Sequence, residues 1–388
     1  MMTNQFAPSK LRAAVRQNRT LASLLIILAT LAGTVVANAD APKIITFDAP
    51  GAGKAAGLGT QGVALGSDGV ILGVYFDANN VSHGFLRERD GTFTTFDAPG
   101  AGTGSTQGTL PYSINRQGEI TGFTFDATSF HGFLRTRDGH FTTIDFPGAL
   151  GTATDNINAA GVVAGNYTDQ GQTIHGVVRA PDGTFSTFDG PGAGIGNFNG
   201  TLTCSTDCIT PEGAIAGDVF DNNGVPHGLL RTPHGHMTTF DIPGASLAPG
   251  QGTMTTGINS AETITGPYVD ASGVSHGYLR ARDGDLTLVD IPGAGTAAGQ
   301  GTVPENINSS GSIIGQYVDA QGVNHGFLRT EHGAISAFDA PGAGNAAKQG
   351  TIPINNNAAN AITGYYIDAN FVYHGFLRTA PSEEDNGE

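Results

Sequence analysis

Histidine and aspartate recur together along this chain at a spacing that suggests paired chemistry. The string His-Gly-Phe-Leu-Arg, or a near copy, occurs seven times, at successive intervals of 48, 44, 52, 49, 49 and 49 residues. An aspartate precedes each histidine by five or six residues, across an expected turn. The histidines are His83, His131, His175, His227, His276, His325 and His374, and the aspartates are Asp77, Asp126, Asp169, Asp221, Asp270, Asp319 and Asp368. An imidazole beside a carboxylate has the groups needed for proton transfer or metal binding.

The regularity of these pairs favours a structural role over a catalytic one. A residue present in every repeat serves a need that every repeat has, whereas an enzyme site usually breaks the symmetry of its repeats. Buried polar groups must be hydrogen-bonded, and a charged partner satisfies them locally. We therefore predict that these residues form one polar network per repeat, and we assign no catalytic, cofactor-binding or metal-binding residue.

Each repeat is expected to contain four β-strands. The first ends at an Ile-Asn pair such as Ile114-Asn115, and the second runs from Ile120 to Asp126 with like residues at every second position, hence on one face. His-Gly-Phe-Leu-Arg forms the third strand and Phe-Thr-Thr-Phe-Asp the fourth, joined by Asp-Gly turns that are typical of hairpins. Four strands in about 49 residues is the size of a propeller blade.

Composition agrees with an all-β protein rich in tight turns. Glycine accounts for 59 of the 388 residues, and each glycine in a helix costs about 1 kcal/mol. The hydrophobic content of 39% is too high for simple disorder.

The two ends of the repeat region complement each other. The last repeat stops after its third strand, at Arg378-Thr379, whereas Ile44 to Asp48 form a fourth strand with nothing before it. A closed ring can pair these fragments and leaves no exposed sheet edge. We therefore predict that residues 40–379 form a single seven-bladed β-propeller of four-stranded blades, closed by the N-terminal strand that completes the last blade. A β-solenoid is the alternative.

The repeat resembles a known family. The pattern I-N-x-x-G-x-I-x-G-x-Y-x-D-x-x-G-x-x-H-G-F-L-R is similar to the HAF-type extracellular repeat of bacterial proteins, which is named for a His-Ala-Phe triplet. Here the triplet is His-Gly-Phe at His83, His131 and His325, and is looser at His175 and His227. The resemblance covers all seven repeats and implies an exported bacterial repeat protein, without implying an activity.

The first 39 residues are expected to be a secretory signal peptide. Four basic residues between Lys10 and Arg19 precede an apolar run from Leu21 to Val36, which closes on Ala37-Asn38-Ala39. An uncleaved anchor helix is the alternative, although the run is shorter than the roughly 20 residues that span a bilayer. Residues 380–388 are expected to form an acidic, disordered tail.

Charge excludes several classes of partner. Removal of the signal leaves 14 basic and 34 acidic residues, a formal net charge of −20. Such a protein repels nucleic acid and anionic lipid. We therefore expect a secreted or periplasmic monomer that binds no nucleic acid and, after signal removal, inserts into no membrane.

The chain contains two cysteines, Cys204 and Cys208, and an exported protein is expected to join them in a disulfide. They lie in an enlarged connection, Gly192 to Thr210, which is the best place for a recognition feature carried by one repeat alone. No cofactor is expected, and a structural calcium ion in loops such as Asp221 to Gly224 is the alternative.

These observations describe an architecture more clearly than an activity. We expect a non-enzymatic, extracytoplasmic binding or scaffold module for a glycan or an extracellular protein, because repeats occupy almost the whole chain. The alternatives are a propeller enzyme, such as a polysaccharide lyase or hydrolase, and a structural surface protein. An enzyme would need acids, histidines or tyrosines that occur in one or two blades and converge on the channel.

Overall fold

The computed structural model describes residues 42–204 and 207–380, which belong to one compact unit, Asp40–Glu388. These residues contain 28 β-strands and no helix, which confirms the all-β class. In this part of the chain, accordingly, no helix is long and apolar enough to cross a membrane. The predicted signal peptide, and residues 381–388 of the predicted tail, lie outside the described residues.

The strands group into antiparallel units of four, although the inner strands β14 and β18 are shorter than their equivalents. The inner strands are β2 (Gly59–Leu65), β6 (Gly108–Ile114), β10 (Gly151–Ile157), β14 (Gly200–Thr203), β18 (Gly257–Ile258), β22 (Gly301–Ile307) and β26 (Gly350–Asn356). The second strands are β3 (Ile71–Phe76), β7 (Ile120–Phe125), β11 (Val163–Thr168), β15 (Ile215–Phe220), β19 (Ile264–Val269), β23 (Ile313–Val318) and β27 (Ile362–Ile367). The third strands are β4 (Ser82–Arg87), β8 (Phe130–Arg135), β12 (Ile174–Arg179), β16 (Pro226–Arg231), β20 (Ser275–Arg280), β24 (Asn324–Arg329) and β28 (Tyr373–Arg378). The outer strands are β5 (Phe93–Phe96), β9 (Phe141–Ile144), β13 (Phe185–Phe188), β17 (Met237–Phe240), β21 (Leu286–Val289), β25 (Ile335–Phe338) and β1 (Ile44–Phe47).

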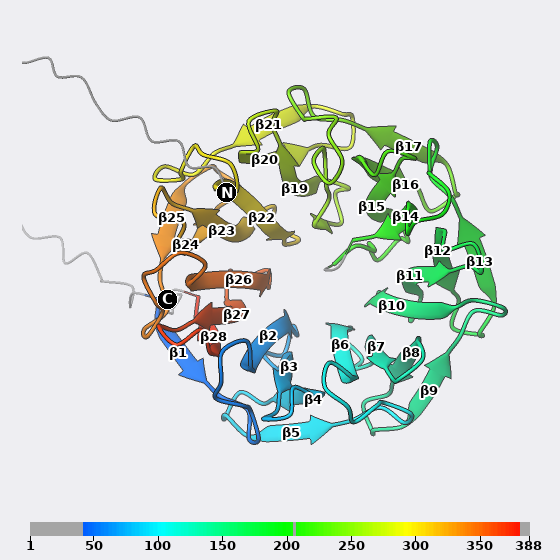
Figure 1. The fold of residues 1–388 in the computed structure, drawn as a ribbon, viewed down its shortest axis with the longest axis horizontal. Helices are drawn as coiled ribbons and strands as arrows, with labels where there is room; N and C mark the ends of the chain where they lie inside the picture. The colour runs from blue at the N-terminus through cyan, green and yellow to red at the C-terminus, as the bar shows by residue number, and fades with distance from the viewer. Residues whose placement is uncertain (1–41, 205–206, 381–388) are drawn as a thin grey trace, which may run out of the picture. The chain divides into compact units, whose positions relative to one another are not determined.

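These units are the blades of a β-propeller, as the repeat predicts. Figure 1 shows them following one another around a common centre, with the inner strands nearest the centre and the outer strands at the periphery. Within a unit, each strand pairs antiparallel with the next, as β22 does with β23, β23 with β24 and β24 with β25. We number the units 1 to 7 from the one that begins with β2.

The first strand of the chain belongs to the last unit. β1 pairs antiparallel with β28, from Ile44 opposite Arg378 to Phe47 opposite Gly375. The Arg87 guanidinium of unit 1 lies over the Phe47 ring, 4.9 Å from its centroid. Because Phe47 comes from the outer strand that completes unit 7, this cation–π contact joins the first and last units in the same way as Arg135 over Phe96 joins units 2 and 1.

A glycine allows neighbouring units to approach closely. Gly301, the first residue of β22, forms a parallel bridge with Ser275 of β20 in the preceding unit. It has a φ of +115°, and a Cβ there would lie 2.0 Å from the Ser275 carbonyl oxygen. Equivalent bridges begin β2, β6, β14 and β26. The glycine of the Gly-Thr pair that opens these five inner strands therefore serves inter-unit packing.

The core is built from two repeated positions. The first residue of each second strand and the residue after His-Gly in each third strand are at most 2% exposed. Full burial of such a side chain contributes about 1.5–3 kcal/mol. The two sets are Ile71, Ile120, Val163, Ile215, Ile264, Ile313 and Ile362, and Phe85, Phe133, Val177, Leu229, Tyr278, Phe327 and Phe376. Their regular recurrence explains why the sequence repeat is so strong.

One sequence-based interpretation is wrong. The segment from Gly192 to Thr210 is not a single enlarged loop, because Gly200–Thr203 form β14, the inner strand of unit 4. The strand divides the segment into an ordinary inter-unit connection before it and a cysteine-containing segment after it. The cysteines therefore lie at the inner end of the unit, close to the other inner strands.

Candidate functional site

The repeated histidines occupy equivalent positions in all seven units. In each, Nδ1 lies 2.8–3.1 Å from an aspartate Oδ1 just after the outer strand. These aspartates open the Asp-x-Pro-Gly turns and are Asp97, Asp145, Asp189, Asp241, Asp290, Asp339 and, for His374, Asp48. This partner was not predicted, because it lies 14 residues after the histidine or, in unit 7, at the other end of the chain.

The aspartates that the sequence did pair with these histidines make the longer contact. Their Oδ2 atoms lie 3.4–4.0 Å from histidine Nε2. Oδ1 of each accepts hydrogen bonds from two amides of the following turn, as Asp270 does from Ser272 and Val274. The hydrogen bond from the Val274 amide is the main cause that lowers the pKa of Asp270. The Ser272 amide and His276 act in the same direction, and burial acts against them. Each carboxylate thus holds its own turn as well as facing the imidazole.

A tyrosine supports the histidine ring in five units. The rings stack with centroids 4.8–5.0 Å apart, as in Tyr317 on His325. In units 2 and 4 the same position holds Thr124 and Val219. One aspartate–histidine–aspartate set therefore recurs in every unit, whether or not a tyrosine is present, and that recurrence suits a structural role.

Surface grooves accompany some of these sets. A groove of about 590 Å³ lies at the seventh, between Asp48, Lys54, Asp368 and His374. A groove of about 280 Å³ lies at the equivalent place in unit 2, beside His131 and Asp145. Both linings contain the repeated histidine and its Nδ1-bound aspartate, so these grooves follow from the repeat.

Two central positions, by contrast, hold different residues in different units. The first is the fifth residue of the Gly-Thr segment, where five of the inner strands bulge. The second follows the glycine of the second strand, across the pair. We call them the central pairs: Val63 with Val74, Tyr112 with Phe123, Asp155 with Asn166, Cys204 with Asp218, Thr256 with Pro267, Glu305 with Gln316, and Ile354 with Tyr365.

Several central pairs are matched in chemistry. Tyr112 and Phe123 stack with centroids 5.2 Å apart. Asn166 donates a hydrogen bond from Nδ2 to Asp155 Oδ2 at 2.8 Å. Gln316 donates one from Nε2 to Glu305 Oε1 at 3.0 Å. In these three pairs an aromatic ring accompanies an aromatic ring, or an acid accompanies an amide, whereas Cys204 with Asp218 and Thr256 with Pro267 show no such match.

Three of the central carboxyl groups have strongly perturbed acidities. Burial raises the pKa of Asp155, of Asp218 and of Glu305 to about 7, although hydrogen bonds from Thr203, Thr255 and Gln316 respectively act in the opposite direction. Such pKa values are found most often at functional sites, but also in structural networks.

Two of the three acids link neighbouring units. Asp155 of unit 3 accepts a hydrogen bond from the Thr203 hydroxyl of unit 4 at 3.1 Å. Asp218 of unit 4 accepts one from the Thr255 amide of unit 5 at 2.8 Å. Both are therefore engaged in packing between units, whereas Glu305 lines a cavity.

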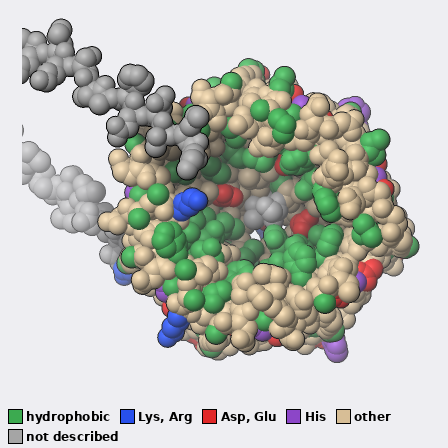
Figure 2. All heavy atoms as spheres, viewed as in Figure 1, with side chains coloured by type: hydrophobic (Ala, Val, Ile, Leu, Met, Phe, Trp, Pro, Cys, Tyr) green, Lys and Arg blue, Asp and Glu red, His purple; other side chains and the backbone are tan. Residues whose placement is uncertain are grey.

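That cavity, which we call the central pocket, has a volume of about 360 Å³. Its walls come from central-pair residues of units 1, 2, 6 and 7 and from their neighbours, and Glu305 supplies the carboxyl group of the lining. The lining residues are Gln61, Gly62, Val63, Val74, Phe76, Leu110, Pro111, Tyr112, Glu305, Ile354 and Tyr365. Figure 2 shows hydrophobic side chains gathered beside the central opening, with acidic side chains at its margin. The central pocket is lined by residues that differ between units, whereas the two peripheral grooves are lined by residues of the repeat.

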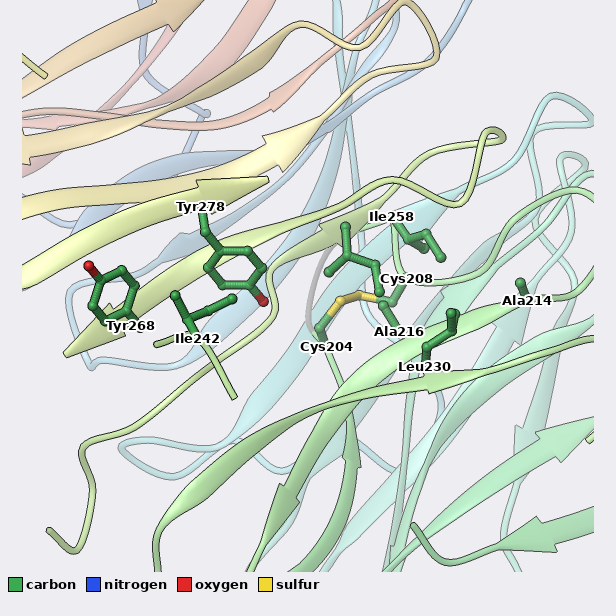
Figure 3. Close-up of a cluster of buried hydrophobic side chains, with 10 residues drawn as sticks. Cys204, Cys208, Ala214, Ala216, Leu230, Ile242, Ile258, Tyr268 and Tyr278 are labelled. Atoms are coloured by element: carbon green, nitrogen blue, oxygen red, sulfur yellow. A yellow bond between two sulfur atoms is a disulfide. The ribbon is translucent and has the colours of Figure 1, made fainter. Parts of the chain in front are cut away.

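The predicted disulfide between Cys204 and Cys208 is present. Both cysteines are buried in an apolar cluster between units 4 and 5 that includes Ile242, Ile258 and Tyr278 (Figure 3). Asn156 of β10 holds the same segment, because its side chain donates to the Cys204 carbonyl at 2.8 Å and accepts from the Cys208 amide at 2.9 Å.

Asp207 connects this segment to more distant units. Its Oδ2 accepts hydrogen bonds from Asn306 of β22 and Asn355 of β26, each at 2.9 Å. Its carbonyl oxygen accepts another from the Ile258 amide at 3.2 Å. These asparagines directly follow Glu305 and Ile354, so Asp207 binds the neighbours of two residues that line the central pocket.

Sequence reasoning missed the central pairs, although a signal was present. When the seven repeats are aligned on Gly-Thr, the fifth residue is different in every one. That pattern resembles drift unless the bulge and the inner position of the strand are known. The sequence alone shows no cluster of acids and tyrosines confined to one or two units, whereas the structure brings Glu305, Tyr112 and Tyr365 to one cavity.

Metal binding has little support from side-chain clustering. Within residues 42–204 and 207–380, no group of three or more histidine, cysteine, aspartate or glutamate side chains is arranged to hold a metal ion. In the loop considered for calcium, Asp221 Oδ1 already accepts hydrogen bonds from the Asn223 and Val225 amides. The calcium alternative stays a prediction.

The fold and this central site define a β-propeller protein. No family model matches the chain, and comparison with curated proteins finds no similar sequence. The resemblance to the HAF-type repeat therefore rests on the repeat residues alone.

Solved propeller structures do resemble the chain. Virginiamycin B lyase from Staphylococcus aureus has a TM-score of 0.55 and 15% identity, over 87% of this chain and 99% of the lyase. The BP39L lectin from Burkholderia pseudomallei has a TM-score of 0.54 and 10% identity, over 83% and 96%. The β-propeller domain of the trilobed protease from Pyrococcus furiosus has a TM-score of 0.53 and 8% identity, over 83% and 95%. At such low identity these similarities show the fold alone.

Proposed function

We propose that this protein is an exported, non-enzymatic binding module whose ligand enters the central pocket. One observation carries the proposal: central-pair residues of units 1, 2, 6 and 7, which differ from unit to unit, line a single cavity, whereas the histidine sets recur in every unit. A volume of about 360 Å³ is within the range of small-molecule sites, which are mostly apolar with a few polar groups.

The pocket is compatible with the glycan or protein ligands expected from the sequence. It admits a small molecule, or one end of a larger ligand such as a terminal sugar or a single side chain. Export is supported by the basic and apolar leader and by the Cys204–Cys208 disulfide, since disulfides persist in oxidising compartments.

A pocket-filling variant tests this proposal. Val63 lies in the pocket wall, so Val63→Phe should occupy its volume, whereas Thr94→Ala on the exposed face of β5 should leave it unchanged. The full chain and both variants are screened by thermal shift and pull-down against small molecules, glycans and secreted proteins. The proposal expects ligands that Val63→Phe loses and Thr94→Ala keeps. Ligands that bind all three proteins equally would place the site elsewhere.

An enzyme is the second candidate, and Glu305 is the observation that favours it. A carboxyl group with a pKa of about 7, beside tyrosines in an apolar cavity, is suited to general acid or base catalysis near neutral pH. A polysaccharide lyase or hydrolase would release products from a polysaccharide panel, and Glu305→Gln would abolish that release. An unchanged rate in Glu305→Gln would exclude this role for the residue.

A further inference from the structure

We propose that the central pocket selects a small organic cation with an apolar body, whose ammonium group lies against the Glu305 carboxylate and the aromatic rings of the wall. The inference rests on the proposed binding function and adds the chemical class of the ligand.

The charge of the pocket points to a cation. Glu305 is the one ionisable acid among the lining residues, and no lysine, arginine or histidine is among them. Gln316 of β23 donates a hydrogen bond to its carboxylate at 3.0 Å. A carboxylate that lines an apolar and aromatic cavity attracts a cation more strongly than it would in water, because the local dielectric constant is low.

Aromatic rings supply the second element. Tyr112 and Tyr365 line the same cavity as Glu305. Tyr112 is held by stacking on Phe123, and Tyr365 packs edge-on against Tyr373 with centroids 5.5 Å apart. Aromatic faces attract ammonium groups, and a carboxylate beside such rings strengthens that preference.

The remaining walls fit an apolar body. Val63, Val74, Leu110 and Ile354 offer aliphatic surface, and the volume of about 360 Å³ is ample for a phenylalkyl chain. The acidic balance of the whole chain, 34 acidic against 18 basic residues, also favours the approach of cations over anions.

Neighbouring titratable groups leave Glu305 as the pH-sensitive element. Tyr365 of β27 faces it. Burial raises the pKa of Tyr365 above its usual range, and the Glu305 charge acts in the same direction. Tyr112 of β6 lies across the pocket with its pKa raised by burial to about 12. Asp207 approaches β22 through Asn306. Both tyrosines stay neutral between pH 5 and 8, so Glu305 dominates titration in the pocket.

Three probes of equal size separate charge from shape: 3-phenylpropylamine, 3-phenylpropan-1-ol and 3-phenylpropanoate. Their binding to the full chain is measured by calorimetry at pH 5.5 and pH 8, and at pH 7 in buffers with different ionisation enthalpies. The amine should bind about tenfold or more tightly than the alcohol at pH 8, and the carboxylate weakest. Because a cation favours ionised Glu305, amine binding should weaken more than about tenfold at pH 5.5 and release a fraction of a proton at pH 7.

Two variants complete the test. Glu305→Gln preserves shape and hydrogen-bonding capacity, so it should fold, bind amine and alcohol within about twofold of each other, and release no proton. Val63→Phe should weaken all three probes. If the alcohol binds the native protein as tightly as the amine, or Glu305→Gln leaves amine affinity and its pH dependence unchanged, cation selectivity is overturned while the binding site stands. If no probe binds, the cation inference fails, and ligands from the broader screen that are insensitive to Val63→Phe would overturn the proposed function as well.

Discussion

The periphery and the centre of this propeller are built on opposite principles. At the periphery, the same histidine lies between the same two aspartates in every unit, seven times over. At the centre, the central pairs range from Val63–Val74 to Glu305–Gln316. A histidine–aspartate set that recurs in every unit is consistent with a role in stability, whereas varying residues of units 1, 2, 6 and 7 that line one cavity are consistent with recognition. In a repeat protein, therefore, a functional site is best sought at the positions that differ between repeats.

The largest expected effect comes from a repeated backbone feature. Gly301→Val forces a β-branched residue into a φ of +115° and places its Cβ 2.0 Å from the Ser275 carbonyl. We expect a loss of roughly 3–5 kcal/mol or failure to fold, measured by urea denaturation. Gly299→Lys is the matched control, because a Cβ at Gly299 meets open space and Lys348 occupies the equivalent place in the next unit at positive φ. A similar loss in both variants would mean that close inter-unit approach is not the reason for the glycine.

The next effect concerns a central acid. Burial raises the pKa of Asp155 from 3.8 to about 7, so the unfolded chain binds fewer protons than the folded one between these values. Ionisation of Asp155 therefore lowers the free energy of unfolding as pH rises from about 4 to about 7. Above pH 7 the whole cost of burying the charged carboxylate is present. Asp155→Asn should remove a penalty of up to about 4 kcal/mol, since each pKa unit corresponds to about 1.4 kcal/mol.

The measurement is the difference in unfolding free energy between pH 5 and pH 8, in the native protein and in the variant. Glu88→Gln, a change at an exposed position outside the centre, serves as control. If the native protein and Asp155→Asn show the same pH dependence, burial in the centre does not raise the pKa of this carboxyl group.

A smaller effect is expected from one peripheral set. His325→Ala removes the contact to Asp339 and the stacking on Tyr317, which should destabilise the protein by about 1–2 kcal/mol. Binding in the central pocket should be unchanged. His332→Ala in an exposed hairpin turn should stay within about 0.5 kcal/mol. Abolished ligand binding with normal stability in His325→Ala would reverse the roles assigned to periphery and centre.

The smallest effect is expected on chelation of metal ions. The Asp221 carboxylate is engaged by backbone amides of its own turn, so treatment with EDTA should shift the melting temperature by less than about 1 °C, measured by circular dichroism. A clear fall in melting temperature that calcium restores would establish the structural ion instead.

The fold was accessible from the sequence because its signals are local and repeated. Asp-Gly turns, alternation in segments such as Ile120–Phe125 and the recurrent buried phenylalanines each act within one unit. The complementary ends likewise anticipated the pairing of β1 with β28.

The candidate site was less accessible because it depends on contacts between units. The bulge at Glu305 interrupts the two-residue alternation of β22, which hides the direction of its side chain. Bonds such as Asp207 to Asn355 span 148 residues, beyond any local pattern. The contact between each repeated histidine and the aspartate after the outer strand, such as His83 with Asp97, was missed for a related reason. It joins the beginning of one strand to the end of the next.

The most direct test of the central claim is a crystal structure of the full chain with bound 3-phenylpropylamine. The account predicts the ligand in the central pocket, with its ammonium group beside Glu305 and its ring against the walls formed by units 1, 2 and 7. Ligand bound instead at the peripheral histidine sets, with the central pocket empty, would contradict it.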